Sequence, residues 1–165
     1  MVNGDSKRHI LSMLVDNQPG VLSRVAGLFS GRGFNIDSLC VSETADPEIS
    51  RITMVAVGDL SILEQIKKQL NKLINVIKVW DFTDTEFVQR ETALLKVRAK
   101  PESRAEILRM ADIFRATVVD VATEFYTLEV TGDEGKITAL LKLLKPLGIK
   151  EIARTGPVAL YRERK

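Results

Sequence analysis

The chain has 165 residues, of which 45% are hydrophobic and 28% charged, so it can bury a core as one domain or two small ones. Its 24 Lys and Arg residues nearly balance 22 Asp and Glu residues, and a net charge of +2 lacks the basic excess typical of nucleic-acid-binding proteins. One cysteine and one histidine exclude an internal disulfide, a Cys/His zinc cluster and an iron–sulfur site. Without a long apolar run or a signal-peptide core, we expect a cytoplasmic protein that does not span a membrane.

The hydrophobic pattern of the first half alternates between the period of strands and that of helices. One helix is predicted from Val21 to Gly31, and a second begins near Asp59, or a turn later if Ser61 and Glu64 form a capping box. Strands are predicted over residues 10–15, 34–43, 49–57 and 76–82. This order is that of a ferredoxin-like unit, an antiparallel sheet with both helices on one face.

The second half repeats the pattern, with a polar linker predicted at residues 83–90. The apolar stripe of the first helix recurs 85 residues later, where Leu22, Val25, Leu28 and Phe29 are matched by Ile107, Met110, Ile113 and Phe114. Strands are predicted over residues 93–99, 118–122, 125–130 and 149–154, with a helix after Asp133. We therefore predict an α+β fold of two tandem ferredoxin-like βαββαβ units, over residues 1–83 and 84–165.

The two halves differ at the start and the end of their first helices. The first half has Asn17-Gln18-Pro19-Gly20 before the helix and a glycine-containing connection up to Ile36 after it. The second half has no glycine at either place, and its second connection is predicted to be about two residues shorter. The unusual backbone therefore lies in one half only.

Gly20 at the start of a helix lets a ligand approach the backbone, because no Cβ intervenes. The N–H groups of Val21 and Leu22, at the positive end of the helix dipole, favour a carboxylate there. The amides of Asn17 and Asn35 can both donate and accept hydrogen bonds, as a zwitterion requires. Because Asn35 begins the next strand, a site that uses both amides can need a second chain. An apolar pocket is predicted from Val21, Leu22 and Ile36.

Purely structural interpretations exist for the turn at Asn17 and for the single histidine and cysteine. Asn17 to Gly20 has ordinary turn composition, His9 is expected to be a packed or surface histidine, and Cys40 a small core residue. A ferredoxin-like nucleic-acid binder needs aromatic residues on its open sheet face, whereas Ile52, Met54 and Ala56, assigned to that face, are aliphatic. A ferredoxin-like enzyme is disfavoured because no nucleophile with a base, carboxylate pair or metal cluster stands out.

The first half closely resembles the ACT domain of the acetolactate (acetohydroxyacid) synthase small subunit. The resemblance is carried by ILSMLVDNQPGVLSRV at residues 10–25 and GLFSGRGFNIDSL at residues 27–39. It continues through SRIT at residues 50–53 and LEQIKKQL at residues 63–70, and in the second half through IFRA at residues 113–116 and ARTG at residues 153–156. It covers nearly the whole chain.

The resemblance implies a non-catalytic regulatory subunit without a cofactor of its own. Members of the family activate a large catalytic subunit, which holds thiamine diphosphate, FAD and a divalent metal such as Mg²⁺, and make it sensitive to feedback by a branched-chain amino acid, usually valine. The effector lies between the ACT domains of two subunits, which implies a homodimer. The positions so implied for the effector are Asn17, Gly20 and Asn35, with Gln18, Pro19, Val21, Leu22 and Ile36 adjacent. The alternative is an ACT-type amino-acid sensor that acts on a different enzyme.

Overall fold

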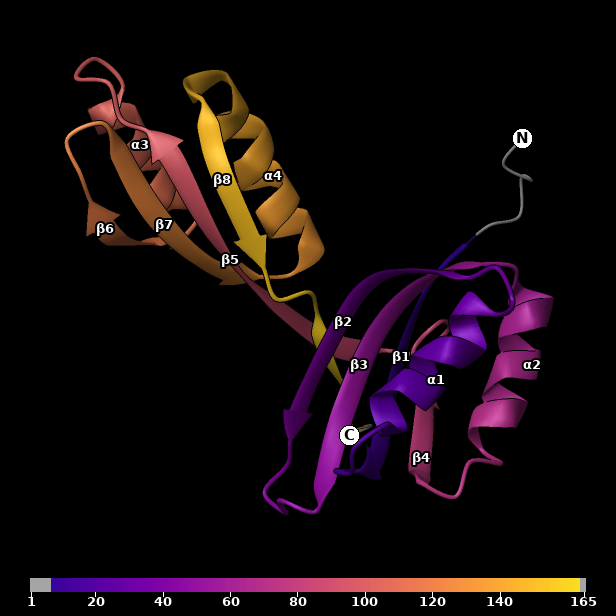
Figure 1. The fold of residues 1–165 in the computed structure, drawn as a ribbon. Helices are drawn as coiled ribbons and strands as arrows, with labels where there is room; N and C mark the ends of the chain where they lie inside the picture. The colour runs from indigo at the N-terminus through magenta and orange to yellow at the C-terminus, as the bar shows by residue number, and fades with distance from the viewer. Residues whose placement is uncertain (1–6, 164–165) are drawn as a thin grey trace. The chain divides into compact units, whose positions relative to one another are not determined.

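The computed structural model describes residues 7–163, which form two compact units (Figure 1). Unit 1 holds the described residues up to Val88 together with the segment from Val158 onward, and unit 2 holds residues Gln89–Pro157. Each unit contains two helices on a four-strand βαββαβ frame, to which a fifth strand is added in the second sheet, so the predicted α+β class and the ferredoxin-like repeat are confirmed. None of the helices in the described part of the chain has the length and apolar character needed to cross a membrane.

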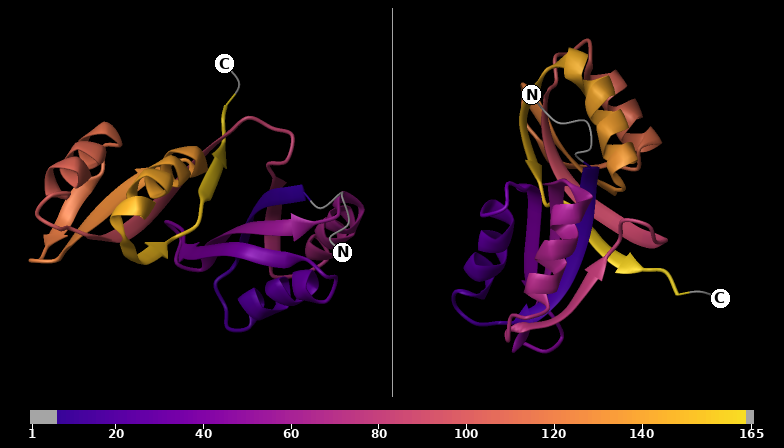
Figure 2. Two further views of the ribbon diagram at one scale, coloured as in Figure 1. Left: turned by 90° about the horizontal axis from the view of Figure 1, so that it is seen from above. Right: turned by 90° about the vertical axis from the view of Figure 1, so that its right-hand side faces the viewer.

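In unit 1 the strands lie in the order β2-β3-β1-β4. The elements of this unit are β1 (Lys7–Asp16), α1 (Val21–Ser30), β2 (Asn35–Glu43), β3 (Ile49–Gly58), α2 (Leu60–Leu70) and β4 (Val76–Asp81). Both helices cover the same face of the sheet (Figures 1 and 2). Beneath them Leu11, Met13, Ile52 and Met54 are fully buried against Phe29 and other helix residues, so the sheet is amphipathic across its two faces.

Two details of the helices differ from the sequence prediction. The buried stripe of α1 is Val21, Val25 and Phe29, whereas Leu22 is 39% exposed. The stripe therefore starts one residue earlier than the apolar pattern indicated. Helix α2 is capped by Asp59, whose carboxylate accepts the backbone N–H of Ser61 at 2.7 Å. This cap satisfies a free N–H of the first turn, so the later capping box is not the start of the helix.

In unit 2 the strands lie in the order β6-β7-β5-β8. The elements are β5 (Phe87–Arg98), α3 (Arg104–Ile113), β6 (Thr117–Val121), β7 (Phe125–Gly132), α4 (Glu134–Leu144), the 3₁₀ turn η1 (Lys145–Leu147) and β8 (Ile149–Arg154). Asp133 caps α4 through the backbone N–H of Lys136, at 2.8 Å, as Asp59 caps α2. The second helix of each unit is thus capped in the same way, by an aspartate side chain.

At the ends of α1 and α3, the backbone hydrogen bonds show that equivalent residues of the two units lie 82 positions apart in the sequence, rather than the 85 that the apolar stripes indicated. Phe34 N–H donates to Phe29 O at 3.1 Å, and Ala116 N–H donates to Ala111 O at 2.8 Å, which places the same helix end at residues 82 apart. A bulge after Ile36 in β2 likewise matches a bulge after Val118 in β6. Between the helix and the next strand lie four residues in unit 1 and three in unit 2, so the second connection is shorter by one residue rather than by the predicted two.

The predicted linker at residues 83–90 is partly wrong, because β5 already begins at Phe87. A further strand that the sequence did not indicate, β9 (Val158–Tyr161), pairs with β5. The rings of Phe87 and Tyr161 lie 5.1 Å and 4.7 Å from that of Phe82, and the Tyr161 hydroxyl donates to Asp81 O at 2.7 Å. This aromatic cluster attaches the end of the chain to unit 1.

Asp81 links β4 to α2 and makes unit 1 sensitive to acid. Burial raises the pKa of its carboxyl, but hydrogen bonds from Lys67 at 2.8 Å and from Thr83 outweigh that effect and lower the pKa. A carboxylate with a lowered folded pKa stabilises the fold above its unfolded pKa and loses this contribution as pH falls through the folded value. We expect Asp81→Asn to reduce the loss of stability below about pH 4, as measured by thermal unfolding across pH. Asp84→Asn, at an exposed position, should leave the acid dependence as in the wild type, and equal curves for both variants would contradict the role of Asp81.

Candidate functional site

The loop between β1 and α1 is held by two other loops of unit 1. The side-chain amide of Asn17 donates to Pro47 O at 2.8 Å, and its backbone N–H donates to Glu48 O at 2.7 Å. On the other side, Arg24 donates to the Asn75 side chain at 2.9 Å, and Asn75 in turn donates to the Asp16 carboxylate at 2.9 Å. The loop is thus fixed at both flanks, although it is exposed.

Gly20 sets the direction in which the chain enters α1. Its φ of 85° lies in the left-handed region, and it caps the helix without any side-chain hydrogen bond. The Val21 N–H forms a long bond of 3.4 Å to Gln18 O, whereas the N–H groups of Leu22 and Ser23 form none with residues 7–163. Two backbone donors at the positive end of the helix dipole therefore face outward, an arrangement suited to a carboxylate. The predicted opening at Leu22 is present, Val21 is partly engaged, and Ser23 is a donor that the sequence analysis missed.

The helix start of unit 2 has the same kind of backbone donors, because the N–H groups of Ala105 and Glu106 form no backbone hydrogen bond with residues 7–163 either. Ser103 and Arg104 stand where unit 1 has Gly20 and Val21, as N-cap and first helical residue, and the Arg104 N–H donates to Lys100 O at 3.1 Å. The Arg104 guanidinium also donates to Ala99 O at 3.1 Å and to Thr123 O at 2.7 Å. The two helix starts thus differ in their capping residue, a left-handed glycine in unit 1 and Ser103 in unit 2, and in the Arg104 side chain beside the second.

Asn35 lies at the opposite end of the unit 1 sheet from this loop. The register pairs Asn35 with Val57 in β3 and Asp16 with Ile49, so the two lie eight β3 residues apart, about 26 Å at the strand rise of about 3.3 Å. The Asn35 amide donates to the Asp37 carboxylate at 2.5 Å, and the neighbouring Ile36 is half-buried. Within one chain, the structure therefore brings Asn17, Gln18, Pro19, Gly20, Val21 and Leu22 together, but not Asn35 and Ile36.

β2 is an edge strand of the unit 1 sheet and carries an apolar surface. Leu39 and Val41 are 37% and 42% exposed on the helix-covered side of this edge, since they pair with the buried Met54 and Ile52. An unpaired edge with exposed branched side chains is a template for another strand. Of the features in this unit, the open helix start and this edge are the two that favour contact with other molecules.

Other candidate residues have structural roles. His9 is fully buried, with its ring nitrogens near the Thr83 hydroxyl and Gly58 O, and Cys40 is half-buried in β2. No group of three potential metal-ligating side chains occurs between Lys7 and Glu163. Ile52, Met54 and Ala56 lie in the core under the helices, so their assignment to the open sheet face is wrong.

The open face of unit 1 instead carries aromatic residues, one of which lies between two cations. Trp80 shares a sheet row with Ser12, and the Arg51 guanidinium and the Lys78 ammonium lie 4.6 Å and 5.0 Å from its ring centre. The absence of nucleic acid among the partners remains a prediction, now based on the balanced charge alone.

The residues that hold the loop were also missed by the sequence analysis. Pro47, Glu48 and Asn75 lie 30 to 59 positions from the loop residues that they bind, and two of the three act through backbone carbonyls. A carbonyl contact leaves no preference for a residue type, so only the side chain of Asn75 could have given a signal. The polar turn composition of both connecting loops was visible, but not their contact with Asn17.

Comparison with known proteins gives consistent matches over both units. A profile described as AHAS small subunit-like ACT domain matches residues 11–78, and one described as small subunit of acetolactate synthase matches residues 90–163. The acetolactate synthase small subunit of Aquifex aeolicus is 52% identical over 97% of this chain and 84% of its own length, and the probable acetolactate synthase small subunit of Methanothermobacter thermautotrophicus is 53% identical over 98% and 97%. The crystal structure of the small subunit from Thermotoga maritima superposes with a TM-score of 0.87 at 43% identity, over 96% of this chain and 99% of that one.

The left-handed φ of Gly20, rather than a lack of space, should determine which residues this position accepts. A Cβ built there meets no atom within 4 Å, so Gly20→Ala introduces backbone strain without a clash and should lower the free energy of unfolding by about 1–2 kcal/mol. Gly20→Asn should cost less, because Asn adopts this region more readily. Urea unfolding measures both.

Gly27→Ala provides the matched control, because Gly27 lies inside α1 with equally open surroundings. This change should stabilise the protein by about 0.5–1 kcal/mol. A Gly20→Ala protein as stable as the wild type would show that the left-handed conformation is not required.

Proposed function

Because the chain belongs to the acetolactate synthase small-subunit family, we propose that it activates a separate catalytic subunit and makes it sensitive to feedback by valine or another branched-chain amino acid. On this proposal the chain itself is not catalytic, and thiamine diphosphate, FAD and Mg²⁺ belong to the large subunit. Residues 1–83, the ACT domain, provide effector binding and dimerisation, while residues 84–165 form the C-terminal domain typical of small subunits. The protein works in the cytoplasm, in valine, leucine and isoleucine biosynthesis.

The observation that best supports the proposal is the glycine-capped helix start of unit 1, where two backbone N–H groups face outward. A free amino acid presents a carboxylate, and the outward N–H groups of Leu22 and Ser23 can bind it without a cationic side chain. Gly20 lets the carboxylate approach, since its missing Cβ leaves open space. The helix start of unit 2 lacks this glycine, because its N-cap is Ser103.

The ammonium and the side chain of the amino acid need different partners. The Asn17 Nδ2 is engaged with Pro47 O, so its Oδ1 is the atom available to accept from an ammonium group. The exposed Leu22 and the half-buried Ile36 offer apolar contacts for a branched side chain. One methylene more or less changes such contacts by about 1–3 kcal/mol, so a preference among valine, leucine and isoleucine is physically attainable.

A twofold dimer through the β2 edges would bring the two distant groups of site residues together. Antiparallel pairing of β2 with its copy places the Asn35 end of one strand beside the Glu43 end of the other. Glu43 shares a sheet row with Ser50 and Val15, next to the loop that contains Asn17 and Gly20. The same pairing would cover the exposed Leu39 and Val41.

A mixing experiment tests this shared site. Gly20→Asp places a negative charge where the carboxylate would bind, and Asn35→Ala removes the amide expected from the partner, so each homodimer should bind valine weakly in calorimetry. After subunit exchange, a mixed dimer has one site with both changes and one with neither, so about a quarter of all sites should regain wild-type affinity.

Two controls accompany the mixing experiment. Gly20→Asn tests the backbone change without the charge, and mixing Gly20→Asp with Asn17→Ala, both on the same side of the site, should restore nothing. Recovery in that second mixture, or none in the first, would contradict a site built from two chains.

Reconstitution with the catalytic subunit tests the regulatory role. The chain alone should not condense pyruvate, and added to the large subunit of the same organism it should raise activity and introduce inhibition by valine. Gly20→Asp should keep the activation and lose the inhibition, because only the effector contact is changed. If the chain binds valine but leaves acetolactate synthase activity unaltered, the alternative of a sensor for a different enzyme is favoured.

A further inference from the structure

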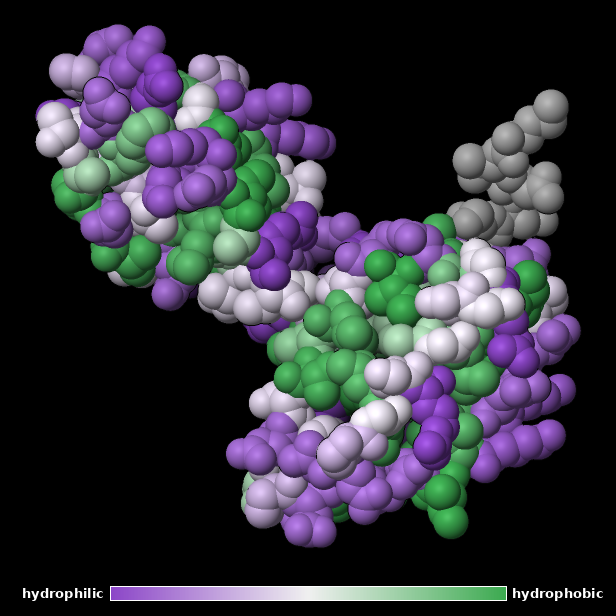
Figure 3. All heavy atoms as spheres, viewed as in Figure 1, coloured by the Kyte–Doolittle hydropathy of each residue, from purple (hydrophilic) through white to green (hydrophobic). Residues whose placement is uncertain are grey.

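Unit 2 contains a groove between helix α4 and the edge strand β8. Its volume is about 640 Å³, and apolar side chains of Leu141, Ile149 and Ile152 line it. Ile152 is 49% exposed, although it pairs with the fully buried Leu95 on the helix-covered side of the sheet. In Figure 3 the surface formed by this part of unit 2 is hydrophobic, with hydrophilic side chains projecting beside it.

One wall of the groove is an unpaired strand edge. β8 pairs with β5 on one side and is the last strand of its sheet. The Thr155 N–H donates to Thr92 O at 3.0 Å, so in the alternating antiparallel pattern the backbone groups of Ala153 face β5 and those of Ile152 and Arg154 face outward. Within residues 7–163 these outward groups form no backbone hydrogen bond, which leaves the edge able to accept a strand.

The equivalent groove of unit 1 is closed by an ion pair. Lys67 of α2 contacts Asp81 of β4 at 2.8 Å and Glu64 at 2.7 Å, so its side chain bridges from the helix to the edge strand. In unit 2 the corresponding positions are Leu141 and Arg154, and Arg154 instead pairs with Glu91 of β5. The repeat thus replaces a polar bridge with an apolar side chain and leaves the groove accessible.

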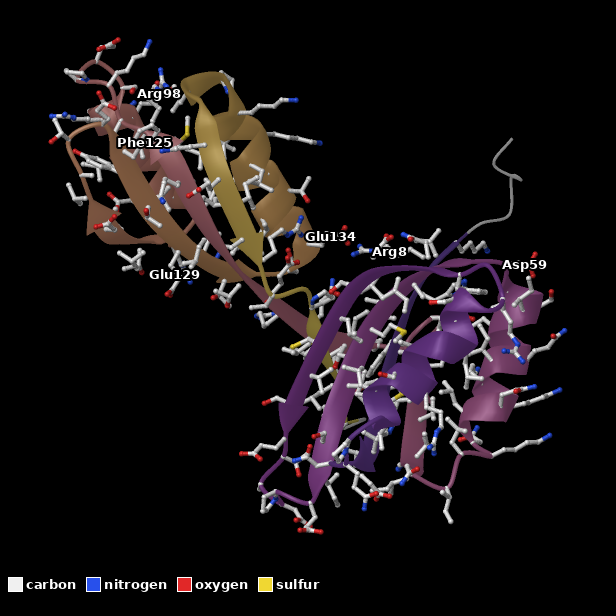
Figure 4. All side chains as sticks on the ribbon, in the orientation of Figure 1. Arg8, Asp59, Arg98, Phe125, Glu129 and Glu134 are labelled. Atoms are coloured by element: carbon white, nitrogen blue, oxygen red, sulfur yellow. The ribbon has the colours of Figure 1, made fainter. Side chains whose placement is uncertain are left out.

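The charge around the groove is positive. Lys142 of α4 and Lys145 of η1 are exposed, and neither has an ion pair with another described residue. The single carboxylate of the lining, Glu151, is paired with Lys96 at 2.7 Å, while the Lys150 ammonium lies 4.6 Å from the ring centre of Phe125, labelled in Figure 4. A twofold contact between two copies would set these lysines against themselves, so the charge disfavours a second copy and favours an acidic partner.

We infer that the α4–β8 groove binds an extended acidic segment of the catalytic subunit, which adds as a strand to β8; this inference rests on the proposed function. The outward N–H and C=O groups of Ile152 and Arg154 would pair with the backbone of the segment. Its apolar side chains would alternate into the groove against Leu141 and Ile149, and its carboxylates would lie near Lys142 and Lys145.

The test measures binding of the full chain to the large subunit of the same organism by surface plasmon resonance. Lys142→Glu with Lys145→Glu should weaken binding at least about tenfold, mainly through a slower association rate, and the affinity of the wild type should fall with added salt. Ile152→Pro should also weaken it, because proline removes an outward donor but no hydrogen bond to β5. The matched control is Lys68→Glu with Lys72→Glu, the same charge change at exposed positions of unit 1 around the end of α2. Circular dichroism and the valine affinity establish that each variant is folded.

The possible outcomes separate the two proposals. If the wild type binds the large subunit and all three variants bind equally well, the groove is not the contact and the inference is overturned, while the regulatory role stands. If the unit 1 control weakens binding as much as the unit 2 variant, the effect is one of general charge, which also overturns it. If the groove variants change the oligomeric state of the chain, the occupant is a second copy. If the wild type does not bind the large subunit at all, the proposed function itself fails.

Discussion

The positive φ of Gly20 is the constraint on which the proposed site depends. It turns the chain from β1 into α1 so that two backbone donors, at Leu22 and Ser23, face outward without an acceptor in the described chain. Unsatisfied donors are tolerated at a helix end only where solvent or a ligand reaches them. Because Asn17 and Asn75 fix the flanks of the loop, the donors are positioned before any ligand arrives, which lowers the entropy lost on binding.

Because of the duplication the two units share one backbone fold, and local differences in sequence determine which surfaces of each unit remain accessible. At the start of the first helix, unit 1 has a glycine cap, whereas unit 2 has Ser103 followed by Arg104, whose guanidinium binds two carbonyl oxygens. At the second helix the situation is reversed, because Lys67 bridges to the edge strand in unit 1 and Leu141 leaves a groove in unit 2. This complementary pattern fits the two proposals, in which unit 1 recognises a small molecule and unit 2 a macromolecule.

The sequence predicted every helix and eight of the nine strands, because each carries a clear apolar period. The errors share one physical origin. The spacing of apolar residues indicates a helix or a strand, but it does not fix which residues of the two units correspond or which residues of two strands pair. An 85-residue offset aligns the helix stripes, but the backbone hydrogen bonds require 83 at the helix start and 82 at its end, so Arg104 takes the place of Val21. β9 was missed because four apolar residues near the end of a chain carry no period, and their partner Phe87 lay in a predicted linker.

The site was predictable in part for a related reason. Residues 17–22 are adjacent in the sequence, so their grouping required no knowledge of the fold. The distance to Asn35 depends on the strand register, which composition and period do not reveal. Likewise, the Arg104 guanidinium at the helix start of unit 2 reaches two carbonyl oxygens, a contact for which the sequence leaves no signature.

The aromatic cluster of Phe82, Phe87 and Tyr161 has a consequence for the order of assembly. The chain leaves unit 1 after Val88 and returns to it at Val158, so unit 2 is an insertion within unit 1. During synthesis, which proceeds from the N-terminus, Tyr161 emerges from the ribosome only after all of unit 2. The N-terminal unit therefore cannot bury the ring of Phe82 fully until unit 2 has been synthesised.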